Sequence, residues 1–144
     1  MPQDQLTELS RLAQKVIAHA DVSIGALFAG SKNIALPGDL AGNVTVALNV
    51  LREMRAGAHL SAVHAVGLGP HGAILSTDDP IRGGRSWAEG FGWKAPHPAP
   101  DPDARVEAEA ITDTICARAY VCLDDGERDS FVELVNQARG LLDA

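Results

Sequence analysis

The sequence predicts an all-α fold: a single compact domain of five or six helices around a buried central helix at about residues 39–68, with a long Pro/Gly/Trp loop. Two observations lead to this prediction. Hydrophobic residues make up 46% of the 144 residues and aromatic ones only 4%, and alanine and leucine outnumber the β-branched residues, which favours closely packed helices. Apolar residues also recur at intervals of three and four along most of the chain. The length suits one domain over residues 1–144.

The first part of the chain contains one clear helix and one ambiguous segment. Apolar residues recur at helical spacing from Leu6 to Ile17, which predicts a helix over roughly residues 4–20. Residues 22–29 are almost wholly apolar, but they are too few for periodicity to separate a strand from a helix. We favour a helix there.

The central helix is expected to start after Asp39, a suitable N-cap, and to end at Gly67 or Gly69. Gly57 is a candidate kink. Apolar residues form one broad stripe and also occur on the opposite side, so we expect a helix that is buried nearly all round. The stripe consists of Val44, Ala47, Leu48, Leu51, Met54, Ala58, Ala62 and Ala65, and the opposite side carries Val46, Val50, Leu60 and Val63.

A short helix at residues 70–75 is followed by a predicted long loop at residues 76–102. This segment holds five of the eight prolines and both tryptophans, and connections of such length are usually functional or disordered. Trp87 and Trp93 either anchor the loop on the core or belong to a lid over a cavity.

Two further helices are predicted after this loop. Asp101 followed by Pro102 suits the N-cap and first turn of a helix that runs to about residue 122. Asp124 with Glu127 resembles a capping box for a terminal helix.

Charge and motifs exclude several classes of function. Asp and Glu outnumber Lys and Arg 19 to 12, so the surface should repel phosphate backbones and nucleic acid is an unlikely partner. No signal peptide or membrane span is visible, which predicts a soluble cytoplasmic protein. Cys116 and Cys122 lack zinc-type or redox spacing and should be thiols. No phosphate-binding glycine motif occurs, and no cofactor is expected.

Titratable side chains on two helices form the candidate site. Arg52, Arg55 and His59 share one flank of the central helix, and Glu53 shares another with His64. Because buried charges are costly without partners, we expect carboxylates of the later helix to face them. The candidate catalytic residues are His59, Glu109 and Asp113, and the candidate ligand-binding residues are Arg52, Glu53, Arg55, Tyr120, Trp87 and Trp93.

Three roles are open for this cluster. It can be a structural ion-pair network that joins two helices. It can be a pocket in which an arginine holds an anionic or carbonyl group while His59 moves protons. A metal site of His59, His64, Glu109 and Asp113 is disfavoured because the two histidines lie well apart around the helix, so no metal is expected.

The segment LREMRAGAHLSAVHAVGL, residues 51–68, resembles the LRExRGDxHxAALxAxGL signature of the uncharacterised MarR-like helix-turn-helix proteins called SalK-like. Leu27-Phe-Ala and Leu36-Pro fit the family's LFAAxxxLPxP segment, and EAITD at residues 109–113 looks like its ExxTD motif. The likeness covers most of residues 24–142 and corresponds to the C-terminal half of a typical, longer member. It implies a helical fold with a charged cluster.

Two departures from the family pattern bear on function. Arg55-Ala-Gly57 stands where the family has RGD, so the aspartate is lost. The Pro/Gly loop containing Gly92-Trp93 takes the place of the family's recognition helix and wing, the parts that a winged helix inserts into DNA. The resemblance therefore implies the fold and the charged cluster more than it implies DNA binding.

These observations predict a small-molecule-binding helical protein, and more specifically an acid–base enzyme of secondary metabolism that uses the buried Arg/His/carboxylate cluster. Whether it is an enzyme stays open. One alternative is a MarR-like transcriptional regulator or a relative that no longer binds DNA. Another is a structural or interaction protein whose ion pairs serve only packing. The expected partners are a small-molecule ligand or substrate and a second copy of the chain in a homodimer.

Overall fold

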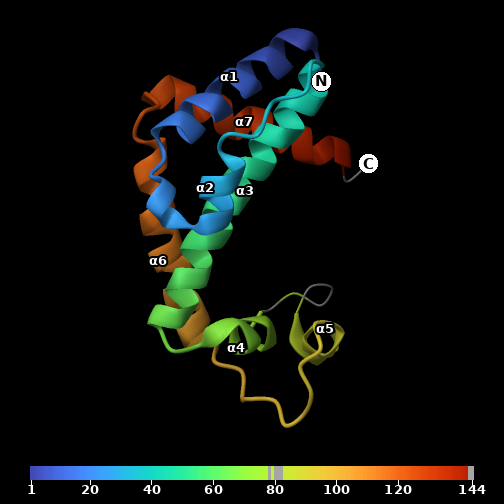
Figure 1. Cartoon of the computed structure of the whole chain (residues 1–144), viewed down its shortest axis with the longest axis vertical. Coiled ribbons are helices and arrows are strands. Elements are labelled where there is room, and N and C mark those ends of the chain that lie inside the picture. The colour runs from blue at the N-terminus through green and yellow to red at the C-terminus, as the bar shows by residue number, and fades with distance from the viewer. Residues whose placement is uncertain (78, 80–82, 143–144) are drawn as a thin grey trace. The chain divides into compact units, whose positions relative to one another are not determined.

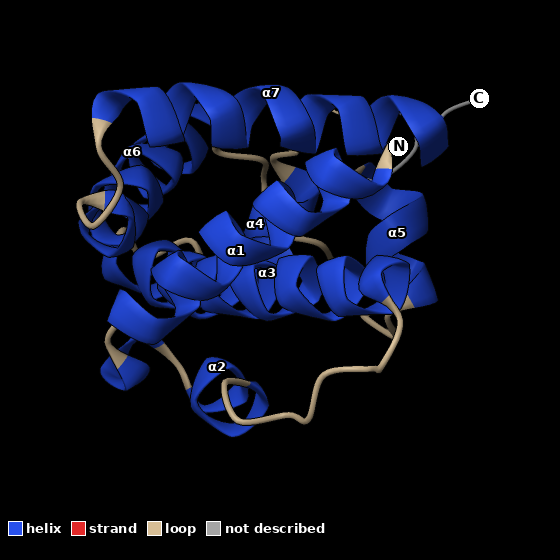
Figure 2. Ribbon diagram, turned by 90° about the horizontal axis from the view of Figure 1, so that it is seen from above, coloured by secondary structure: helices blue, strands red, loops and turns tan. Residues whose placement is uncertain are grey.

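The computed structural model describes residues 1–77, 79 and 83–142. Within these residues it contains seven α-helices, one 3-10 helix and no strand, which confirms the all-α prediction (Figures 1 and 2). The helices are α1 (Gln3–His19), η1 (Val22–Ile24), α2 (Ala26–Ser31), α3 (Leu40–Ala65), α4 (Gly69–Leu75), α5 (Gly84–Gly90), α6 (Pro102–Tyr120) and α7 (Asp125–Leu142).

The chain divides into two compact units. Unit 1 contains Met1–Gly57 and Ile115–Ala144, and unit 2 contains Ala58–Thr114. Helices α3 and α6 each contribute residues to both units. The single domain predicted over residues 1–144 stays a prediction.

Three aspartates cap helices as the sequence predicts. The Asp39 carboxylate accepts a hydrogen bond from the Gly42 backbone N–H at 2.7 Å, and Asp101 accepts one from Ala104 at 2.9 Å. Asp124 and Glu127 form the expected capping box, in which each side chain accepts from the other residue's backbone N–H. Local hydrogen bonding therefore fixes the starts of α3, α6 and α7.

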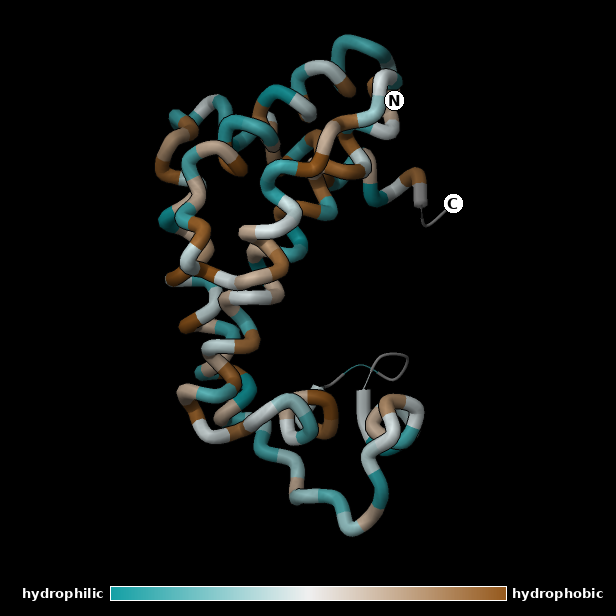
Figure 3. Tube along the Cα trace, in the orientation of Figure 1, coloured by the Kyte–Doolittle hydropathy of each residue, from teal (hydrophilic) through white to brown (hydrophobic). Residues whose placement is uncertain are grey.

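The core of unit 1 lies between α1, α2, α3 and α7. Phe28 of α2 and Met54 of α3 are fully buried in it, together with one face of α1. The prediction that α3 is buried nearly all round is wrong. Leu60 is 51% exposed, and polar and apolar residues alternate along the helix, as Figure 3 shows. The apolar residues outside the main stripe misled the prediction, because only Val50 and Val63 among them are buried and Leu60 faces solvent.

Residues 22–29 are helical in two short pieces, η1 and α2, rather than in one helix. Gly25 separates the two pieces and lies against Gly57 of α3. A Cβ atom built on Gly57 would lie 2.9 Å from the Ile24 carbonyl oxygen and 3.0 Å from Gly25 Cα. Gly57 therefore allows close backbone contact with the η1–α2 junction, which accounts for a glycine inside α3. The kink at Gly57 stays a prediction.

We expect Gly57→Ala to lower the free energy of unfolding by about 1–3 kcal/mol, because the new methyl group meets backbone atoms that cannot turn aside. Gly140→Ala is the matched control, since a Cβ there meets nothing within 4 Å in helix α7. That change should stabilise by roughly 0.5–1 kcal/mol through helix propensity. Chemical denaturation measures both, and equal effects of the two changes would show that Gly57 has no packing role.

Helices α1 and α7 are joined by ion pairs within unit 1. Lys15 Nζ lies 2.5 Å from Glu127 Oε2, and Arg11 Nη2 lies 3.1 Å from Glu127 Oε1. The hydrogen bond from Lys15, followed by the backbone N–H of Asp124, lowers the pKa of Glu127 from 4.5 to about 2. The carboxylate is therefore an acid-sensitive link between the two helices.

Because the folded-state pKa of Glu127 is depressed, its stabilising contribution is present above about pH 4.5 and is lost as the pH falls through about 2. We expect Glu127→Gln to reduce stability at neutral pH and to flatten the loss of stability over this acidic range. Thermal denaturation at a series of pH values measures this. Glu133→Gln on the same helix is the control, and it should leave the slope intact.

Unit 2 has a small core made mainly of short side chains. One cluster of its buried apolar residues consists of Ala62, Val63, Ala73 and Ala108, and Ala58, Leu75 and Ala88 are buried as well. Polar contacts add to this packing: the Ser76 hydroxyl accepts a hydrogen bond from the Asp101 backbone N–H at 2.7 Å. Because alanine buries little apolar area, such polar contacts matter more in unit 2 than in unit 1.

The predicted helix at residues 70–75 is present as α4, but residues 76–102 are not wholly a loop. Helix α5 lies inside this segment, and it raises the helix number above the expected five or six. A seven-residue helix is too short to produce a recognisable period, which explains why the sequence pattern missed it. Ala88 of α5 is fully buried. The predicted loop residues 78 and 80–82 lie outside the described residues.

Candidate functional site

The sequence-predicted site residues fall in different units. Arg52, Glu53, Arg55 and Tyr120 belong to unit 1, whereas His59, Glu109, Asp113, Trp87 and Trp93 belong to unit 2. Among the predicted residues, the structure brings together His59 and Glu109, which belong to one hydrogen-bond network in unit 2. It joins the C-terminal part of α3 to the N-terminal half of α6.

Both ring nitrogens of His59 are engaged. His59 Nδ1 lies 3.0 Å from Thr112 Oγ1, and Arg105 Nη1 lies 2.7 Å from His59 Nε2. Arg105 also pairs with Glu109 one turn later on α6, at 2.6 Å between Nη2 and Oε1. The hydrogen-bond network therefore runs from the Glu109 carboxylate through Arg105 and His59 to Thr112.

The hydrogen bonds at Thr112 determine the tautomer of His59. The single hydroxyl proton of Thr112 is donated to the Ala108 carbonyl oxygen at 2.7 Å, so toward His59 the hydroxyl can only accept. His59 must then carry its proton on Nδ1. Nε2 is consequently an acceptor, as the N–H of Arg105 requires. Two independent contacts thus define a neutral ring with one tautomer.

This geometry agrees with the first of the three roles considered for the cluster, a structural network that joins two helices. A general base needs a ring nitrogen within reach of a substrate proton, and here Arg105 and Thr112 contact both ring nitrogens. Asp113 is exposed and Glu109 pairs within its own helix. The catalytic roles of His59, Glu109 and Asp113 stay predictions.

The predicted ligand-binding residues of unit 1 are arranged differently. Arg52 donates from Nε to Asn49 Oδ1 at 3.1 Å and pairs with Glu53 at 2.5 Å, so its contacts come from its own helix. Arg55 is exposed. The Tyr120 ring packs at 5.9 Å from Phe131 in the core, and burial raises the pKa of its phenol. Tyr120 is therefore partly buried and packs against the core of unit 1.

Sequence reasoning missed Arg105 and Thr112. One signal was available for each: Arg105 lies four residues before Glu109, the spacing of a helical ion pair, and Thr112 is a hydroxyl one turn beyond the buried Ala108. Neither signal indicates that His59 of another helix is the partner. That contact depends on how α3 and α6 pack.

We expect Thr112→Val to lower the free energy of unfolding by about 1–3 kcal/mol, because the isosteric change leaves the His59 Nδ1–H without its acceptor. Thr114→Val is the matched control on the same helix. The exposed Thr114 hydroxyl makes the same bond to a carbonyl four residues back, at 2.9 Å from Ala110. Denaturant unfolding should show the control within about 0.5 kcal/mol of the native protein. Equal costs would contradict a structural role for the buried hydroxyl.

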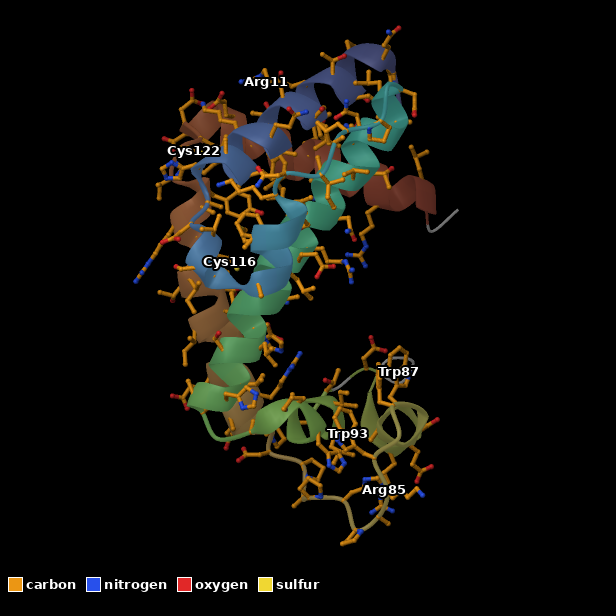
Figure 4. The ribbon with its side chains drawn as sticks, viewed as in Figure 1. Arg11, Arg85, Trp87, Trp93, Cys116 and Cys122 are labelled. Atoms are coloured by element: carbon orange, nitrogen blue, oxygen red, sulfur yellow. The ribbon has the colours of Figure 1, made fainter. Side chains whose placement is uncertain are left out.

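An aromatic cluster packs α5 and the following segment against α4. The His71 ring stacks on Trp93 with centroids 5.0 Å apart, and Phe91 contacts both tryptophans. His71 Nε2 lies 3.0 Å from His97 Nδ1, so one of these rings donates and the other accepts. Figure 4 shows Trp93 near α4, and Trp87 and Arg85 on different sides of α5. Trp93 thus anchors this segment, as the first of the two sequence-based alternatives predicts, and the lid stays a prediction.

Comparison with protein families gives one match. The model of a helix-turn-helix family covers residues 1–101, which include α3, α4 and α5. The chain belongs to this helix-turn-helix family. Searches of curated proteins and of solved structures found no match.

The residues matched by the helix-turn-helix family include α4 and α5. Helix α4 follows α3 after a short turn in which Gly67 has a positive φ of 76°, as in many helix-turn-helix units. Helix α5 comes next, inside the segment where the sequence indicated that a recognition helix was lost. The family assignment agrees with the resemblance at the level of a helix-turn-helix protein.

Three further findings concern metal binding, the membrane and the cysteines. No group of three or more His, Cys, Asp or Glu side chains within the described part of the chain is placed to hold a metal ion. No helix among residues 1–77 and 83–142 has the length and apolarity to cross a membrane. Cys116 and Cys122 are not in a disulfide, which confirms the expected thiols.

Proposed function

We propose that this protein binds double-stranded DNA through α4 and α5 and acts as a transcriptional regulator. The observation that carries this proposal is the family match, because it extends over both helices. In helix-turn-helix proteins the first helix crosses the DNA backbone and the second enters the major groove. Helices α4 and α5 have these two roles in the proposal.

The contacts within unit 2 support this role for α5. The His71–Trp93 stack and the His71–His97 hydrogen bond hold the segment after α5 against α4, so α5 is presented from a packed support. Arg85 is exposed on α5, on a different side from Trp87 (Figure 4). An arginine can bind a phosphate or the edge of a guanine, which makes Arg85 the candidate DNA contact.

Charge limits the strength of this binding. Residues 58–114 contain eight Asp and Glu against four Lys and Arg, a net charge of −4 with neutral histidines. Few cations can replace the counterions of DNA, so nonspecific affinity should be low and binding should need low salt. Acidity was the reason for expecting no nucleic-acid partner. The family match supports DNA binding despite this acidity, because it covers α5, a helix within the segment that was expected to be a loop.

The finer parts of the assignment are also proposals. We infer a MarR-like, SalK-like regulator, for which the motif resemblance over residues 51–68 is the support. We also infer a homodimer, since helix-turn-helix dimers bind two half-sites about one DNA turn apart. A palindromic binding site would follow from such a dimer.

The test is selection of bound duplexes from a randomised library at low salt, followed by fluorescence anisotropy. We expect one duplex sequence to be enriched, and Arg85→Glu to weaken its binding about tenfold or more, in line with roughly 1–3 kcal/mol for a good contact to a base. Arg118→Glu, an equal charge change at an exposed residue of unit 1, should leave affinity nearly unchanged. Absence of any retained duplex, or equal losses in both variants, would contradict the proposal.

A further inference from the structure

We propose that His71 and His97 together hold one proton at mildly acidic pH, and that this proton strengthens the attachment of α5 to α4. His71 lies on α4, and His97 lies in the segment that follows α5, so both belong to unit 2. His71 Nε2 lies 3.0 Å from His97 Nδ1. The effect on packing does not require DNA, whereas the effect on regulation rests on the proposed function.

The other ring nitrogen of His97 is buried without a hydrogen bond. The His97 side chain is 6% exposed, and its Nε2 has no hydrogen-bond partner in the described part of the chain. A carboxylate oxygen of α5, Glu89 Oε1, lies 3.6 Å from this nitrogen, which is beyond hydrogen-bonding distance. Buried polar atoms are normally paired. An unpaired nitrogen beside a carboxylate therefore indicates a contact that forms fully in another protonation state of the ring.

In the neutral pair, the carboxylate of Glu89 determines where the protons lie. A bare Nε2 of His97 would direct its lone pair at a negative oxygen, so His97 carries its proton on Nε2 and accepts at Nδ1. His71 then donates from its Nε2 to His97 Nδ1. The neutral pair thus shares one hydrogen bond and makes only a long contact to α5.

One added proton strengthens these contacts. An imidazolium donates from both nitrogens, so a cation on either ring keeps the His71–His97 hydrogen bond and makes it charge-assisted. A positive His97 ring attracts Glu89 and turns the long contact into an ion pair with α5. A positive His71 ring lies against the face of Trp93, with centroids 5.0 Å apart and planes 3° from parallel. A second proton would place two N–H donors opposite each other, so the pair accepts only one.

The surroundings of the pair decide whether the charge is tolerated. Among the contacts that the described residues make with the two rings, the charged group is Glu89 of α5, and the aromatic group on α4's side is Trp93 (Figure 4). Burial of a ring opposes its charge, but the shared proton can lie on His71, which is only half-buried. Histidine is the side chain that normally gains its charge in this range of pH.

Amide hydrogen exchange of the full chain, measured by NMR, tests the effect on packing. The backbone N–H groups of Phe91, Gly92 and Trp93 donate to carbonyls of α5 at 2.9–3.0 Å, so their exchange reports on opening of this helix. After correction for the intrinsic effect of pH, their protection should rise about twofold to fivefold from about pH 8 to about pH 6, the equivalent of an ion pair with an exposed carboxylate. Unchanged protection would overturn the proposal.

Two variants with matched controls assign the effect to the pair. Glu89→Gln, at a side chain that is 64% exposed, should abolish the rise in protection without disturbing the fold. Glu107→Gln, at an exposed carboxylate on α6, should leave the rise intact. His97→Asn keeps an acceptor for His71 but cannot become a cation, so it should remove most of the rise. His64→Asn, at an exposed histidine of unit 2, should not, and equal effects in variants and controls would contradict the proton site.

Fluorescence anisotropy with the selected duplex tests the effect on regulation. We expect tighter binding at about pH 6 than at about pH 8, because the protonated pair holds α5 more firmly on α4. Glu89→Gln makes the protein less negative, which by charge alone favours DNA, yet it should reduce this pH dependence. If exchange responds to pH and no duplex is retained, the proposed function fails and the proton site stands. If a duplex binds and Glu89→Gln changes neither response, the proton site is wrong.

Discussion

Within unit 2, helices α3 and α6 are joined by two hydrogen bonds, which His59 makes with Arg105 and Thr112. The buried apolar residues in the described part of unit 2 are five alanines, one valine and one leucine, which together bury little apolar area. His59 joins α3 to α6 with hydrogen bonds of 3.0 and 2.7 Å, and the second of these comes from a charged donor. Hydrogen bonds to charged groups contribute more than neutral ones, particularly where water is excluded.

Polar contacts also hold α4 and α5, the helices proposed to contact DNA. Helix α4 follows α3 through Gly67, and Ser76 at its end accepts from the residue that caps α6. The segment after α5 is then held to α4 by His71, Trp93 and His97. Polar and aromatic contacts thus position α4 and α5 where a larger protein would use an aliphatic core.

Local rules account for most of what the sequence predicted correctly. Asp39, Asp101 and Asp124 cap the helices that they were expected to cap, because an N-cap needs only a side-chain acceptor and a backbone N–H two or three residues later. Most of the main apolar stripe of α3 is buried for an equally local reason, its spacing, although Leu48 is half-buried and Ala65 is exposed. Such features do not depend on where the rest of the chain lies.

The features that were missed depend on contacts between distant segments. The partner of His59 could not be read from α3, because Arg105 lies 46 positions further along the chain. The packing role of Gly57 was not predicted, because it comes from contact with Gly25 in another segment. A groove on unit 1 is lined by residues of α1, α3 and α7, which are far apart in sequence, so no pattern within one helix reveals it. Helix α5 was missed for a different reason, its shortness.

The most direct test of this account is the tautomer of His59 at neutral pH, measured by long-range proton–nitrogen NMR with signals assigned through a His59→Gln variant. A neutral ring with its proton on Nδ1 and an unprotonated Nε2 is the predicted result, since Thr112 accepts from the first nitrogen and Arg105 donates to the second. Free histidine in water prefers the opposite tautomer. A ring with its proton on Nε2, or one that averages between states as an exposed histidine does, would contradict the account.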